Sequence, residues 1–148
     1  MNIQLGDVGH IIQLAIAPVF LLTGVGTNLL VLTNRLSRII DRSRTLEERF
    51  STVGDAEQAE FRAELGTLFR RAHLINRAIT LNTSCALLIC LVIAALFIGD
   101  ALNLGLDQFI AALFVLAMLS LIGSFIYFLR EIFIATQTLS MRALVARL

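Results

Sequence analysis

Two Asn-Arg pairs stand at the boundaries of long uncharged stretches, Asn34-Arg35 at the end of the first and Asn76-Arg77 just before the second. Arg stays protonated in any protein setting and presents five N–H donors in a fixed fork, which suits phosphates and carboxylates. Further Arg residues lie close to both pairs. We therefore expect an arginine collar that holds lipid phosphates or other anions and consists of five residues, Arg35, Arg38, Arg70, Arg71 and Arg77.

Asp41 is the acid that lies closest to the collar in the sequence, and we expect it to be the internal partner of the collar. The alternative to an anion site is structural: the collar anchors the chain to headgroups and pairs internally with Asp41. If several chains surround an axis, the same Arg residues form a ring, and rings of Arg are one way in which a pore favours anions.

Polar side chains also lie inside the first uncharged stretch. Thr23, Thr27 and Asn34 follow one helical face, and Asn28 lies beside them. A polar group in hydrocarbon must find a partner or water. These four residues are therefore candidates for lining a pore. The alternative is an interhelical hydrogen-bond network.

The remaining residues with chemical potential do not form a recognisable site. His10 and His73 lie on opposite sides of a span, while Cys85 and Cys90 point about 140° apart on one helix and form no CxxC motif. The sequence contains no visible pair of nucleophile and base, phosphate loop or carboxylate dyad. We expect no metal, no cofactor and no enzymatic activity.

Three uncharged stretches of membrane-spanning length position these residues. They cover residues 10–34, 78–99 and 108–129, and about 20 mainly apolar residues suffice to cross the hydrocarbon of a bilayer. The chain has 148 residues, of which 57% are hydrophobic and 16% charged. This predicts an all-α integral membrane protein with a single membrane domain over residues 1–148. The net charge of +1 argues against a nucleic-acid partner.

The basic residues lie on one side of these stretches only. All 12 of them are Arg, and none precedes residue 35 or falls between residues 78 and 129. Short loops rich in Arg stay in the cytoplasm. We therefore expect the N-terminus outside and the C-terminus inside.

Residues 35–77 predict a cytoplasmic helical hairpin, because apolar residues recur at intervals of three and four on both arms. Each arm is expected to continue its transmembrane helix without a break, so that the three helices extend into a cytoplasmic stalk. A C-terminal helix over residues 130–148 carries another apolar stripe. It either joins the stalk or lies on the membrane surface.

The string Asn34-Arg35-Leu36-Ser37-Arg38 with Asp41-Arg42, followed by Arg70-Arg71 and a second span, resembles a domain-of-unknown-function family of small bacterial membrane proteins. The likeness covers nearly the whole chain. It implies a bacterial protein with three spans and an Arg-rich cytoplasmic hairpin, and it implies no activity. We expect a multi-pass protein of the bacterial inner (cytoplasmic) membrane.

Two functions from different classes follow from these features. The first is a homo-oligomeric ion channel, with the polar stripe along its axis and the collar as an anion-favouring cytoplasmic mouth. The alternative is a membrane-anchored scaffold without enzymatic activity, whose stalk binds a protein partner or anionic lipid. The expected partners are further copies of the chain and anionic headgroups.

Overall fold

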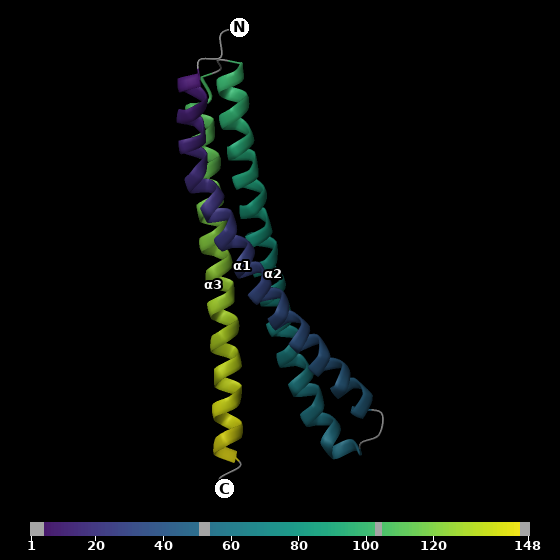
Figure 1. Cartoon of the computed structure of the whole chain (residues 1–148). Coiled ribbons are helices and arrows are strands. Elements are labelled where there is room, and N and C mark those ends of the chain that lie inside the picture. Colours follow the sequence, from purple (N-terminus) through teal and green to yellow (C-terminus); the bar gives the residue numbers. More distant parts are fainter. Residues whose placement is uncertain (1–4, 51–53, 103–104, 146–148) are drawn as a thin grey trace. The chain divides into compact units, whose positions relative to one another are not determined.

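Three long α-helices form the chain in a computed structural model that describes residues 5–50, 54–102 and 105–145. Side chains are described for residues 9–49, 54, 58–102 and 105–137. The helices are α1 (Leu5–Phe50), α2 (Asp55–Ala101) and α3 (Asp107–Val145) (Figure 1). The described ranges contain no strand, which confirms the all-α prediction.

All three helices are long and apolar enough to cross a membrane. The spans lie within Gly9–Arg49, Gln58–Ala101 and Asp107–Gln137, whose best windows have mean hydropathies of 2.0, 2.5 and 2.6. Large apolar side chains on these segments face outward: Phe20 is 74% exposed and Leu87 is 63% exposed. Lipid is the medium that tolerates such a surface. The chain is a multi-pass membrane protein.

The arms of the charged hairpin continue their spans without interruption, as the sequence predicts. α1 extends from its apolar stretch to Phe50, and α2 runs from Asp55 into the second apolar stretch. α3 likewise continues unbroken past its apolar stretch to Val145. Residues 138–148 of the predicted C-terminal helix, with the apolar stripe that they carry, lie outside the residues whose side chains are described.

Buried positions recur every seven residues on each helix. A seven-residue repeat keeps one seam of a helix facing its neighbours, as in coiled coils. On α3 the repeat comprises Ala117, Ser124 and Glu131. On α2 it runs through Leu68, Ile75, Asn82 and Ile89, and on α1 through Ile11, Pro18, Val25, Leu32, Ile39 and Leu46.

Contacts divide the chain into two compact units, and each helix contributes to both. The first comprises Met1–Leu29 and Leu81–Gly123, and the second Leu30–Thr80 and Ser124–Leu148. The single domain predicted from the sequence stays a prediction.

The first unit has an apolar core and a close approach between α2 and α3. The core consists of Val25, Cys85, Ile89, Ala117 and Leu121. A Cβ atom added to Gly123 would lie 3.1 Å from the Leu81 side chain. Ser120 Oγ donates to the Leu81 carbonyl at 2.7 Å. Small residues thus allow these two helices to approach each other.

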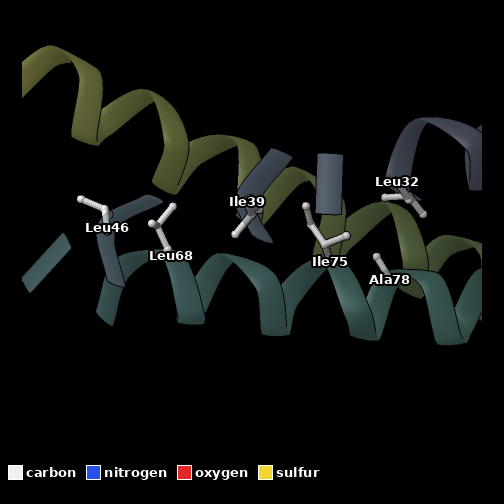
Figure 2. Close-up of a cluster of buried hydrophobic side chains, with 6 residues drawn as sticks. All are labelled: Leu32, Ile39, Leu46, Leu68, Ile75 and Ala78. Atoms are coloured by element: carbon white, nitrogen blue, oxygen red, sulfur yellow. The ribbon is translucent and has the colours of Figure 1, made fainter. Parts of the chain in front are cut away.

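In the second unit, a row of buried apolar side chains packs between α1 and α2 and joins the two arms of the hairpin (Figure 2). Tyr127 and Phe128 of α3 pack against this row. Ser124 of α3 is fully buried and donates to the Ala78 carbonyl at 2.8 Å. The row itself consists of Leu32, Ile39, Leu46, Leu68, Ile75 and Ala78.

Candidate functional site: an arginine groove on α1, α2 and α3

A fully buried carboxylate organises the site. Glu131 of α3 has no exposed surface. Its Oε2 accepts from Arg35 Nη1 of α1 at 2.8 Å, and its Oε1 accepts from Nε and Nη2 of Arg71 of α2 at 3.0 and 2.8 Å. Hydrogen bonds between ionised groups are the strong ones, and two guanidinium groups compensate the burial of this charge. We call these three residues the Glu131 triad.

The seven-residue repeat explains why these side chains meet. Glu131 continues the buried line of α3, two repeats after Ala117. Arg35 and Arg71 flank the buried seams of α1 and α2, so their long side chains reach sideways to α3. Arg35 also lies over the Phe128 ring, 5.3 Å from its centroid, in cation–π geometry. The triad therefore joins all three helices.

A second ion pair follows one repeat further along α1. Arg42 donates from Nε and Nη2 to Glu64 Oε1 of α2 at 3.1 and 2.9 Å. Both side chains are partly exposed, at 47% and 18%. An exposed pair of this kind stabilises the fold by about 0–1 kcal/mol. Its larger effect is to hold Arg42 on the same flank as Arg35.

Four Arg residues and five smaller side chains enclose a groove of about 390 Å³. This volume falls within the range typical of small-molecule sites, about 300–1,000 Å³. We call it the arginine groove. Its lining consists of Arg35, Arg38, Ile39, Arg42, Leu68, Arg71, Ile132, Ala135 and Thr136.

The arginine groove carries an excess of positive charge. Glu131 and Glu64 offset two of its four guanidinium charges, which leaves +2. Arg38 is exposed and forms no hydrogen bond or ion pair with any residue that the structure describes. All five of its N–H donors are therefore available to a ligand.

The structure brings together three of the five predicted collar residues and places the other two elsewhere. Arg35, Arg38 and Arg71 line the groove together with Arg42. Arg77 lies apart: its Nε donates to His73 Nε2 at 3.1 Å, and its guanidinium lies 6.0 Å from the centroid of the Tyr127 ring. Arg70, the fifth predicted residue, is exposed and does not line the groove.

The structure gives the role of internal partner to Glu131 and not to Asp41. Asp41 lies on the exposed face of α1, and none of the ion pairs among the described residues involves it. The physical reason is the direction in which the Arg side chains extend. Arg35 and Arg71 point toward α3, so the nearest carboxylate in space comes from another helix.

The polar residues predicted to line a pore form local and interhelical hydrogen bonds. Asn28 Nδ2 donates to Asn82 Oδ1 at 2.9 Å, and Asn82 Nδ2 donates to the Val25 carbonyl at 2.9 Å. Thr23 and Thr27 are exposed and donate to carbonyls of their own helix, at 3.4 and 3.0 Å. Asn34 is also exposed, and its carbonyl accepts from Ser37. The network alternative thus accounts for Asn28, while the pore-lining role stays a prediction.

Replacing Asn82 by Leu is expected to destabilise the chain in detergent by about 1–2 kcal/mol, because the Asn28 amide loses its partner inside the span. Asn82 is fully buried, so no water replaces it without a rearrangement. The double variant N28L/N82L removes both amides and is expected to recover much of the loss. Equilibrium unfolding of both single variants and the double variant measures the coupling, and additive effects would contradict the network.

Sequence reasoning missed Glu131, Arg42 and Glu64 as parts of the site. A usable signal exists for Glu131, because it stands seven residues after Ser124 and fourteen after Ala117, on a line of small residues. A charge on a line of small residues indicates a seam between helices that holds an ion pair. No comparable local signal marks Glu64, which depends on the register of the hairpin.

The described residues contain no group of three or more His, Cys, Asp and Glu side chains placed to hold a metal ion. Cys85 is buried in the core of the first unit, and Cys90 is exposed. Neither belongs to the arginine groove.

A comparison with protein families finds a match that covers most of the chain. A family model described as "Protein of unknown function (DUF2721)" matches residues 15–141. The matched range includes every residue of the arginine groove and of the Glu131 triad. No match was found among curated proteins or among solved structures.

Proposed function

The chain belongs to the DUF2721 family of proteins of unknown function, and we propose that it is a membrane-anchored scaffold without enzymatic activity that holds anionic lipid headgroups in the arginine groove. The single observation that carries this proposal is the surplus charge of the groove, +2 after its own carboxylates are counted. If these guanidinium groups only stabilised the fold, we would expect each of them to pair with a carboxylate of the chain.

The place of the groove in the sequence supports a lipid rather than a soluble anion. Arg35 directly follows the uncharged stretch 10–34, and Ile132 comes three residues after the stretch 108–129 ends. The groove therefore begins at the depth where headgroups lie. The distribution of Arg favours the cytoplasmic side of a bacterial inner membrane, and anionic lipids attract basic segments near a membrane surface.

Replacing Arg38 by Gln is expected to weaken binding to anionic lipid about tenfold. The change removes one charge-assisted contact with the lipid, of the order of 1.5 kcal/mol, and no hydrogen bond or ion pair within the described part of the chain. Native mass spectrometry of the protein titrated with phosphatidylglycerol, with phosphatidylcholine as the neutral lipid, measures the affinity.

Arg44→Gln is the matched control for that measurement. Arg44 is also exposed on α1, six residues beyond Arg38, and does not line the groove. The two variants lose the same charge, so their difference isolates the groove from general attraction to the membrane. Equal losses in both variants would leave the groove without a role.

The homo-oligomeric channel expected from the sequence stays a second hypothesis. Its support is that Thr23, Thr27 and Asn34 are exposed, so a ring of copies has polar side chains to place on an axis. The bond between Asn28 and Asn82 counts against Asn28 as a pore-lining residue. The mass of the detergent complex separates the two functions, because a monomer or dimer of three-span chains encloses no polar lumen.

A further inference from the structure

We propose that the arginine groove selects a lipid whose headgroup is a phosphate monoester, which carries nearly two negative charges, over a lipid whose phosphate is a diester with one charge. This inference rests on the proposed function and names the ligand class of the same site. Phosphatidic acid has the first chemistry, and phosphatidylglycerol has the second.

Charge balance supports a doubly charged ligand. The groove has four guanidinium groups, and among the residues whose side chains are described only Glu131 and Glu64 form ion pairs with them. A phosphate monoester carries about −1.5 to −2 at neutral pH. It therefore neutralises the remaining +2 almost completely, whereas a diester leaves one guanidinium charge uncompensated in a partly enclosed space.

The free donors of the groove match the acceptors of a terminal phosphate. Arg42 keeps Nη1, Arg71 keeps Nη1, and Arg35 keeps Nε and Nη2 beyond the bonds that each forms with a carboxylate. Arg38 adds its whole guanidinium group. A monoester presents three terminal oxygens and a diester only two, so the monoester accepts bonds from more of these side chains.

The apolar part of the lining suits the rest of a lipid. Ile39 of α1, Leu68 of α2, and Ile132 and Ala135 of α3 lie beside the guanidinium groups. They provide contact for the glycerol carbons next to the phosphate, and free inorganic phosphate has nothing to place there. We therefore expect the lipid, and not the free anion, to be the ligand.

Binding to nanodiscs of three compositions tests the inference: neutral phosphatidylcholine alone, phosphatidylcholine with phosphatidic acid, and phosphatidylcholine with enough phosphatidylglycerol to match the total charge. The intact chain is expected to prefer phosphatidic acid about tenfold, which corresponds to one additional charge-assisted contact. R38Q is expected to reduce the preference to about twofold, and R44Q to leave it unchanged. Thermal unfolding of both variants in detergent checks that they are folded.

The outcomes separate this inference from the proposed function. Equal affinity for the two acidic lipids at matched charge, with a loss in R38Q, would overturn the selectivity and leave the proposed function standing. Affinity no higher than for phosphatidylcholine would overturn both. Displacement of phosphatidic acid by an equal concentration of inorganic phosphate would contradict the claim that the ligand is a lipid and not the free anion.

Discussion

Replacing Glu131 by Gln is expected to destabilise the protein by about 3 kcal/mol, the low end of the range of about 3–5 kcal/mol for a buried ion pair that loses one partner. The fully buried carboxylate accepts three hydrogen bonds from two Arg residues, and Gln offers one acceptor oxygen without charge. Arg35 and Arg71 are 39% and 24% exposed, so both retain some hydration, which places the effect at the low end.

Equilibrium unfolding in mild detergent measures this loss. Glu47→Gln is the control, because Glu47 is exposed on α1 and its side chain forms no ion pair with any residue that the structure describes. E47Q is expected to change stability by less than about 0.5 kcal/mol. If E131Q were as stable as E47Q, the Glu131 triad would have no structural role.

The triple variant R35M/R71M/E131L is expected to recover the stability that E131Q loses and to lose lipid binding more than about a hundredfold. Apolar residues of similar volume often replace a buried ion triad at no cost, or with a gain of about 1–4 kcal/mol. The same change removes two of the four guanidinium groups that line the groove. Each guanidinium group contributes about 1.5 kcal/mol or more to the binding free energy of a charged ligand. The loss of both therefore weakens the affinity more than about a hundredfold.

This variant separates the stabilising role of the triad from its proposed role in binding. Unfolding in detergent and native mass spectrometry with phosphatidylglycerol, carried out on the same preparation, give both values. A stable triple variant with the affinity of the parent chain would show that lipid binds elsewhere. A triple variant as unstable as E131Q would show that the three charges determine the packing of the helices.

The helices and spans were predictable from the sequence because they depend on local patterns. Uncharged stretches of about 20 residues determine a span in hydrocarbon, and apolar residues at intervals of three and four determine the buried face of an arm. The uncharged stretch ends at Asn34 and the amphipathic arm begins at Arg35, with no Gly or Pro near this boundary to break the helix. The continuity of spans and arms follows from this, and the structure confirms it.

The pairing of charges was not predictable by the same means, because it depends on register between helices. Asp41 is close to Arg35 along the chain but is exposed on α1, while Glu131 lies 96 residues away and binds Arg35 from α3. Asn28 and Asn82 are 54 residues apart and meet for the same reason. Only the seven-residue spacing of buried positions, read on all three helices together, contains this information.

Contact between a lipid phosphate and the guanidinium group of Arg38 is the central claim, and solid-state NMR tests it most directly. Protein with ¹⁵N-labelled Arg is placed in bilayers that contain phosphatidic acid, and the dephasing of guanidinium nitrogen signals by lipid ³¹P is recorded. In R38Q the dephased signal is expected to fall by more than the contribution of Arg38 alone, because the phosphate leaves the other Arg residues of the groove as well. In R44Q the dephased signal is expected to stay as in the parent chain. Equal dephasing in R38Q and R44Q would contradict the lipid site.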